Sequence, residues 1–374
     1  MGGGSVTLVP AGDSASRPNR CRLGHTPCIG WPRPSPAQLR RLVGVAILGL
    51  LIAAGLDVRL VRGDRGRAGA PPPGGDREVV AALAHAGRSV GADWVRRALG
   101  YDGSGITVAI IDSGITAWHG DLAGADGAQR VVRFVDYVDG RTDPHDDYGH
   151  GTHVAGVVAG NGAGSSGLHA GIAPGARLAV LKVLDGAGRG HARDVAAAID
   201  HVVAHAHDLN IRVINISVTA APQGPPAVDP LALAALRAVE AGVTVVAAAG
   251  NLGAPAGGRR AAGVAAPGDA PWVIAVGALD GRGTPDPGDD VVAPFSARGP
   301  APFGGMPKPD LVAPGVDVVS LAEPGSLLFQ SQPEARVWGL QPAWSPLYFT
   351  MSGTSVAAAV VSGVVALMLQ ANPA

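Results

Sequence analysis

Residues 107–115 read Thr-Val-Ala-Ile-Ile-Asp-Ser-Gly-Ile, an apolar run that ends at an aspartate followed by turn residues. The continuous apolar stretch 108–111 predicts a short strand that is buried inside the protein. Serine and glycine then favour a turn, so Asp112 stands where the strand ends. An Asp-Ser-Gly sequence after a strand is most often only a turn. The rest of the chain must therefore decide whether Asp112 does chemistry.

Outward from this stretch, short apolar runs alternate with segments of helical periodicity. We expect strands at 131–138, 178–184, 211–216 and 243–248, and helices at 150–159, 194–209, 230–241 and 355–369. This alternation predicts an α/β fold with a mainly parallel central sheet that is flanked by helices on both faces. Ligands bind beyond the carboxyl ends of the strands in such sheets. Asp112, Ser217 and Asn251 all stand at or just past such an end.

Length, charge and cysteine content narrow the class of protein. A chain of 374 residues can bury the core of one α/β domain of about 250–280 residues and still carry further segments. The formal net charge of −1 gives no sign of a nucleic-acid partner. The two cysteines, Cys21 and Cys28, precede the first apolar run. This excludes a disulfide framework and a thiol nucleophile in the main domain. We expect a monomer.

The first 88 residues divide into three segments. Residues 1–41 are rich in Gly, Pro and Arg without periodicity, and we expect them to be disordered. As a helix, the apolar run 42–56 would reach about 22 Å, short of a hydrocarbon core of about 30 Å. Its length favours a signal peptide, with a membrane anchor as the open alternative. Residues 57–88 are expected to be a solvated linker. We therefore expect a secreted or extracytoplasmic protein that either loses this run or is tethered by it.

Three motifs carry Asp112, His150 and Ser355. A carboxylate, an imidazole and a hydroxyl are the parts of a nucleophilic acyl-transfer site. Asp before His before Ser is also one of the three chain orders known for this triad. Plainer interpretations exist for two of the motifs. His150 and His153 could ligate a metal, although no Glu or Cys stands nearby at a metal spacing. Ser355 and the threonine before it could be an ordinary helix cap.

From about Gly91 onward, over about three quarters of the chain, the sequence resembles the subtilase family of subtilisin-like serine peptidases. The matching segments keep the family's order and approximate spacing: 107–115 (TVAIIDSGI), 150–156 (HGTHVAG), 213–217 (VINIS), 245–251 (VVAAAGN), 295–300 (FSARGP), 308–315 (KPDLVAPG) and 353–355 (GTS). The resemblance implies a three-layer subtilisin-like catalytic domain over residues 89–374. It also implies a serine endopeptidase that acts on polypeptides and requires no cofactor for its chemistry.

The resemblance implies a role for each candidate. Ser355 would be the nucleophile at the start of a helix, where unpaired N–H groups favour developing negative charge. His150 would take the Ser355 proton and later deliver it to the leaving amine. Asp112 would fix the His150 tautomer and stabilise the imidazolium. His153 matches a second family histidine, which we assign to structure.

Further residues are implied in oxyanion and substrate binding. Asn251 would donate its side-chain amide to the oxyanion, beside the Ser355 N–H. Two stretches resemble the edges between which an extended peptide lies as an added strand. The substrate-binding residues implied are Gly188, Arg189, Gly190, Ser217, Val218 and Thr219, with Ala248, Ala249 and Gly250 on one wall of the first pocket.

The chain departs from the family pattern in several places. Thr219 and Ala220 stand where relatives usually carry Gly-Gly, so we expect side chains that narrow or reshape the groove. The region 57–91 is too short for the family's common folded inhibitory prodomain. Relatives usually continue beyond the helix that carries the serine, so a C-terminally truncated catalytic domain is one interpretation.

The sequence also bears on metal binding and on functions other than peptide hydrolysis. Residues 161–169 contain no carboxylate, so we expect no calcium site in that loop, while calcium elsewhere stays open. His201, His205 and His207 could bind a metal, but a partly exposed histidine face is the simpler interpretation. The main rival function is a catalytically inactive subtilase fold that acts as a binding or scaffold protein. An α/β-hydrolase esterase is excluded because no Gly-x-Ser-x-Gly surrounds Ser355.

Overall fold

The computed structural model describes residues 82–373 except 117, 125, 254–262, 285 and 341–344, all within the compact unit Asp76–Ala374. The apolar run 42–56 and most of the expected linker therefore lie outside the described residues. Helix α2 (Ala82–Ser89) occupies the end of that linker, and its Ala86 is buried in the main apolar core. Because Ala86 packs in the core of the catalytic domain, this domain starts before residue 89, where we expected its boundary.

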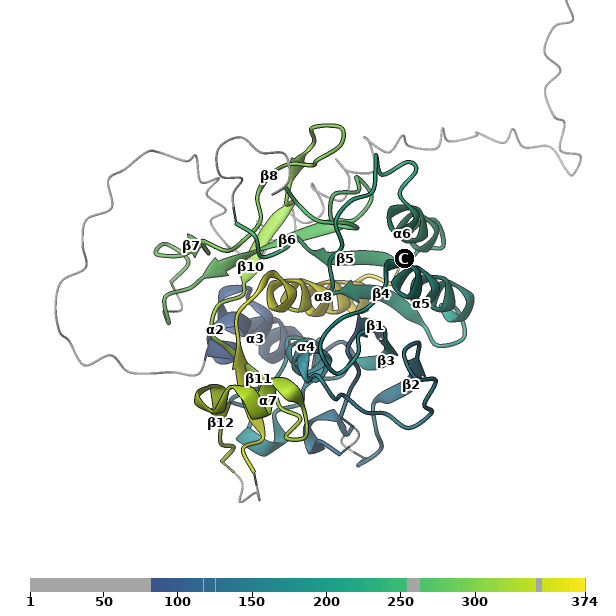
Figure 1. Ribbon diagram of the computed structural model, residues 1–374. Coiled ribbons are helices and arrows are strands. Elements are labelled where there is room, and N and C mark those ends of the chain that lie inside the picture. Colours follow the sequence, from purple (N-terminus) through teal and green to yellow (C-terminus); the bar gives the residue numbers. More distant parts are fainter. Residues whose placement is uncertain are drawn as a thin grey trace, which may run out of the picture. The chain divides into compact units, whose positions relative to one another are not determined.

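An eight-stranded sheet forms the centre of the fold (Figure 1), with strand order β10-β6-β5-β4-β1-β3-β2 and β7 beside β6. Neighbouring strands are parallel except for the β6–β7 pair. The strands are β1 (Thr107–Asp112), β2 (Val131–Asp136), β3 (Arg177–Lys182), β4 (Ile211–Ile216), β5 (Thr244–Ala248), β6 (Ile274–Asp280), β7 (Val291–Val292) and β10 (Leu311–Pro314). The expected mainly parallel sheet is confirmed.

Two strands are shorter than the apolar pattern predicts. The strand expected at 131–138 ends at Asp136, whose carboxylate accepts the N–H groups of Val138 and Asp139 and so starts a turn. The strand expected at 178–184 ends at Lys182. Its buried ammonium donates a hydrogen bond to the carbonyl of Leu184, two residues further along the chain, at 2.8 Å. In both cases a polar side chain forms hydrogen bonds with backbone groups that would have to pair with a neighbouring strand if the strand were longer.

Helices cover both faces of this sheet. Helices α4 (His150–Ala159) and α8 (Thr354–Ala371) pack on the face that holds Val108 and Ile110 of β1. Helices α5 (Ala192–His205) and α6 (Pro230–Glu240) pack on the opposite face, against Ala109 and Ile111. Successive residues of one strand therefore enter different apolar clusters, as the strand geometry requires. The expected three-layer arrangement is confirmed (Figure 1).

Smaller elements surround the three layers. They are α3 (Ala92–Trp94) with a π-helical turn (Val95–Leu99), α7 (Leu327–Ser331), the antiparallel sheet β11 (Val318–Leu321), β13 (Tyr348–Met351) and β12 (Arg336–Val337), the pair β8 (Gly299–Pro300) and β9 (Pro307–Lys308), and 3₁₀ turns at Gly120–Leu122, Ala163–Ser165 and Pro333–Ala335. Among the described residues, α8 alone is long and apolar enough to cross a bilayer, and 67% of it is buried in the protein. It serves as the core helix of this domain.

His153 ties helix α4 to the small antiparallel sheet. Its side chain is fully buried, and Nε2 donates to the Val318 carbonyl at 3.0 Å. Burial lowers the pKa of His153 to about 3. The imidazole is therefore neutral near pH 7, which agrees with a structural assignment.

We expect the free energy of unfolding to decrease as the pH is lowered from about 6.5 toward about 3. In this window the unfolded chain binds a proton at His153 and the folded protein does not, so acid favours unfolding. His153→Gln keeps an amide donor for Val318 but cannot titrate, and it should lose this part of the pH dependence. Urea unfolding of both proteins at several pH values measures the effect. Equal pH slopes would contradict the prediction.

Candidate active site

Asp112 and His150 form a short, buried pair at the end of β1. Asp112 is fully buried between β3 and β4. Its Oδ1 accepts hydrogen bonds from His150 Nδ1 and from the Ser113 N–H, each at 2.7 Å. An ionised carboxylate can only accept, so the proton of neutral His150 lies on Nδ1. Nε2 is then the free basic nitrogen.

The surroundings of His150 favour its protonated form. Burial by itself lowers the pKa of His150, but the charges of Asp112 and Asp146 and the hydrogen bond to Asp112 outweigh it, so the pKa is raised. Oδ2 of Asp112 is also buried and meets no donor in the described part of the chain. A buried carboxylate with an unused oxygen is stabilised by a positive neighbour. The pair therefore suits an imidazole that accepts a proton during a reaction.

Two glycines let helix α4 approach the backbone beyond Asp112. A Cβ on Gly151 would lie 2.3 Å from the Gly114 carbonyl oxygen. A Cβ on Gly114, which has a φ of +126°, would lie 2.0 Å from the His145 carbonyl oxygen. A side chain at Gly151 would push the helix away, and one at Gly114 would push away the loop that leads into the helix. The glycines of the two motifs thus bring His150 within hydrogen-bonding distance of Asp112.

Ser355 lies in the first turn of α8, where backbone N–H groups have no acceptor within the helix. Its Oγ donates to the Ser217 carbonyl at 2.9 Å, and the Ser217 Oγ donates back to the Ser355 carbonyl at 2.9 Å. No hydrogen bond joins Ser355 to His150 within the described ranges. Rotation about the Cα–Cβ bond moves Oγ to other staggered positions. Catalytic hydrogen bonds often tighten only when substrate is bound.

A chain of buried hydrogen bonds supports Ser355 from below. Ser217 Oγ accepts from Asn215 Nδ2 at 2.8 Å, and Asn215 Oδ1 accepts from Ser362 Oγ at 2.9 Å. Asn215 belongs to β4 and Ser362 to α8. These bonds hold the N-terminal half of α8 against the end of β4.

Asn251 follows β5 and is bound to the residue before Ser355. Its Oδ1 accepts from both the N–H and the Oγ1 of Thr354, each at 2.9 Å. Thr354 Oγ1 in turn accepts the Gly250 N–H at 3.0 Å. The amide nitrogen of Asn251 donates to no described residue. It is therefore available as a donor near the start of α8.

A cavity of about 300 Å³ opens beside His150. It contains five of the six residues expected on the two substrate edges: Gly188, Gly190, Ser217, Val218 and Thr219. Arg189 does not line it, because its side chain is 81% exposed and lies 3.7 Å from the Asp185 carboxylate. Six further lining residues stand outside the motifs that the sequence offers: Tyr148, Leu184, His191, Ala192, Val195 and Leu231.

The two residues that we expected to narrow or reshape the groove lie at this cavity, and their backbone is not strained. Thr219 and Ala220 both line it, and neither has a positive φ. Ala220 exchanges backbone hydrogen bonds with Ala266 at 3.1 and 3.0 Å. Their side chains therefore occupy groove space while the backbone stays regular. Ala248 and Ala249 are buried in two apolar clusters, and neither lines this cavity.

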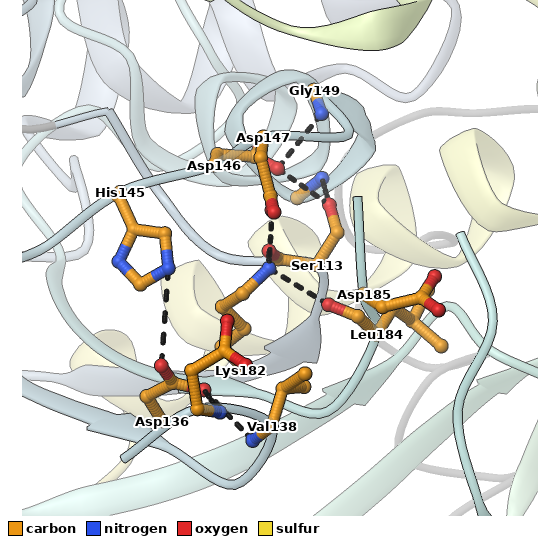
Figure 2. A network of polar contacts seen from close by, with 12 residues as sticks. Ser113, Asp136, Val138, His145, Asp146, Asp147, Gly149, Lys182, Leu184 and Asp185 are labelled. Carbon is orange, nitrogen blue, oxygen red and sulfur yellow. Dashed lines mark hydrogen bonds and ion pairs between the residues drawn. The ribbon is translucent and has the colours of Figure 1, made fainter. Parts of the chain in front are cut away.

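Asp146 and Lys182, two buried charged residues to which the sequence assigned no role, both bind Ser113, the residue after Asp112 (Figure 2). Asp146 accepts hydrogen bonds from the Ser113 Oγ and from the start of α4. Lys182 Nζ donates to the Ser113 carbonyl at 2.7 Å and to Asp147. The sequence held one signal for the second residue: Lys182 is one of only two lysines in a chain whose other cations are arginines.

In the described part of the chain, one group of side chains could hold a metal ion: Asp136, Asp139 and His145, with ligand atoms within 4.8 Å of one another. Asp136 already accepts three backbone N–H groups of the same loop. His150 and His153 do not converge on one ion, because Nδ1 of the first faces Asp112 and Nε2 of the second faces Val318.

Curated proteins include close relatives of this chain. The serine protease AprX of Bacillus subtilis (strain 168) is 40% identical over 304 residues, which cover 80% of this chain and 64% of AprX. Subtilisin E of the same organism is 33% identical over 275 residues, which cover 73% of this chain and 58% of that protein. The chain thus spans about three fifths of the length of these relatives.

Solved structures agree with the expected fold. The S41 psychrophilic protease is 32% identical, with a TM-score of 0.56 over 73% of this chain and 80% of its own. A cold-adapted subtilisin-like serine proteinase is 29% identical, with a TM-score of 0.52 over 73% of this chain and 78% of its own. The subtilisin-like architecture is confirmed. A sequence model described as the Subtilase family also matches residues 103–374, and the chain therefore belongs to the subtilase family.

Proposed function

We propose that this protein is a serine endopeptidase that hydrolyses peptide bonds through an acyl-enzyme. Asp112, His150 and Ser355 are the triad. The observation that carries the proposal is the 2.7 Å hydrogen bond from His150 to a fully buried Asp112. Ser217, whose carbonyl holds the Ser355 hydroxyl, lines the same cavity as His150. The relatives AprX and the subtilisins add support, because AprX is named a serine protease.

The chemistry begins when Ser355 Oγ turns from the Ser217 carbonyl toward His150. Nε2 takes the hydroxyl proton while Oγ attacks the carbonyl carbon of the scissile peptide bond. Asp112 stabilises the imidazolium, which then protonates the leaving amine. Water repeats the sequence on the ester and releases Ser355. The raised pKa of His150 fits this cycle, since the ring must hold a proton between the two steps.

The negative oxygen of the tetrahedral intermediate is stabilised by two donors. One is the Ser355 N–H, which has no acceptor within the helix. The other is the Asn251 amide nitrogen, because the Asn251 oxygen is held by Thr354. Donors that are fixed before the reaction cost no reorganisation when charge develops.

The substrate lies in an extended conformation between 188–190 and 217–219. Strand addition uses backbone hydrogen bonds for affinity and pockets for selectivity. Gly190 must stay without a side chain, because a Cβ there would lie 2.2 Å from the Val183 carbonyl oxygen. Leu184, Val218 and Leu231 give the cavity apolar walls. Polypeptides are therefore the substrate class.

An active-serine probe separates this proposal from an inactive scaffold. We expect a fluorophosphonate to label the folded protein, because the nucleophile and its base are both present. The Ser355→Ala variant should not be labelled. Ser352→Ala, which changes a nearby serine outside the triad, is the matched control and should be labelled like the parent. Absence of label on parent protein with a cooperative unfolding transition would favour the scaffold function.

Asn251→Asp tests the oxyanion donor alone. The carboxylate keeps an acceptor for Thr354 but has no amide to donate. We expect kcat to fall by about a hundredfold to a thousandfold, with a smaller effect on KM. Asn251→Ala, which also loses the bond to Thr354, should be no more active. Steady-state kinetics on a peptide substrate measure both, and an unchanged kcat in Asn251→Asp would remove Asn251 from the mechanism.

We further propose that residues 42–56 direct export of the catalytic domain and are then cleaved or kept as a tether. The length and apolar character of the run support export. We expect the Ser355→Ala chain, which cannot process itself, to leave the cytoplasm. N-terminal sequencing distinguishes the two fates, because a start just after residue 56 means cleavage and an intact run means a tether. A full-length protein that stays in the cytoplasm would contradict the proposal.

A further inference from the structure

We propose that Asp146 is a positioning residue of this active site: it holds the first turn of α4 so that His150 faces Asp112, and its buried charge favours the imidazolium. The inference rests on the proposed function, in which His150 is the base. Asp146 itself touches neither substrate nor the reacting atoms.

Both carboxylate oxygens of Asp146 accept two hydrogen bonds, and all four donors are uncharged. Its side chain is almost fully buried (3% exposed for the residue). Oδ1 accepts from Ser113 Oγ at 2.8 Å and from the Gly149 N–H at 2.7 Å. Oδ2 accepts from the N–H and the Oγ1 of Thr152 at 2.8 and 2.7 Å. Since no cation is among these four donors, no ion pair offsets the carboxylate charge of Asp146.

Two of these donors, on Ser113 and Gly149, belong to the chain neighbours of the catalytic pair; Figure 2 shows both bonds to Asp146. Ser113 directly follows Asp112, while Gly149 directly precedes His150. Ser113 Oγ also accepts the Gly151 N–H at 2.8 Å, so it links the end of β1 to the helix on both sides of His150. Asp146 and Ser113 together therefore set the distance between β1 and the first turn of α4. A helix cap that served α4 alone would not need the contact with Ser113.

The charged groups around His150 come from several elements. Asp112 ends β1, Asp146 lies in the loop before α4, and His153 on α4 itself is neutral near pH 7 because burial lowers its pKa to about 3. Lys182 of β3 donates to Asp147 and to backbone carbonyls, and forms no hydrogen bond with Asp146. Burial lowers the pKa of His150; the charge of Asp112 raises it most, and the charge of Asp146 raises it further. Asp146 is thus a second, more distant carboxylate that acts on the same ring.

The variant Asp146→Asn keeps the shape of the side chain and removes its charge. In the Ser355→Ala background, we expect the NMR signals of the His150 ring to titrate at lower pH than in Ser355→Ala alone. In the active protein, the acid limb of kcat/KM should move to lower pH in the same way. The plateau should fall by about tenfold to a hundredfold, because the amide cannot accept all four hydrogen bonds and His150 is less well placed.

Two further variants separate the effect of the Asp146 charge from its effect on the position of His150. Ser113→Ala breaks the link to α4 but leaves the charge of Asp146, so the plateau of kcat/KM should fall while the His150 titration moves little. Asp136→Asn is the matched control: this carboxylate also caps the loop before α4 through three backbone N–H groups, but it is not among the charges that act on His150. It should leave the titration of His150 unchanged.

The outcomes are distinguishable from failure of the proposed function. The NMR titration uses the Ser355→Ala protein and needs no peptidase activity, so a parent chain without activity would overturn the enzyme proposal and leave the His150 titration measurable. If folded Asp146→Asn keeps both the titration and the kcat/KM profile of its parent, Asp146 has no positioning role. If Asp146→Asn does not fold, an unchanged kcat/KM plateau in Ser113→Ala overturns the inference.

Discussion

The structure depends on one contact, the hydrogen bond between a buried carboxylate at the end of β1 and the imidazole at the start of α4. A charge in the middle of a parallel sheet is costly unless polar partners meet it. Asp112 meets this condition with His150 and the Ser113 N–H. The bare backbone at Gly114 and Gly151 makes the approach of the helix possible, since a Cβ at either glycine would collide with a carbonyl.

Further buried charges surround this contact. Asp146 and Lys182 lie on either side of Ser113, one bound to its hydroxyl and the other to its carbonyl. Each is nearly or fully buried. A polar network of this kind gives a unique geometry when every member is satisfied, and removal of one member leaves the others buried without partners. The network links Ser113 to the start of α4, and the cavity opens beside His150.

Much of the fold could be predicted because it follows from local patterns. Continuous apolar runs marked the strands, helical periodicity marked α4, α5, α6 and α8, and the alternation implied a parallel sheet with two covered faces. The errors have local causes. Asp136 and Lys182 ended two strands early through their own side-chain hydrogen bonds. Helix α2 was assigned to a linker because a short segment reveals little periodicity, although Ala86 packs in the core.

The sequence by itself determined the family, the sheet and the identity of the three triad candidates, because each motif couples an apolar element to a polar residue at its end. Only the tertiary structure decided how these residues meet. Asp146 binds Ser113, which lies 33 positions away in the chain. The Ser355 hydroxyl donates to the carbonyl of Ser217, which lies 138 positions away. Such contacts depend on how β1, β4, α4 and α8 pack, and side-chain packing between distant segments leaves no periodic signal in the sequence.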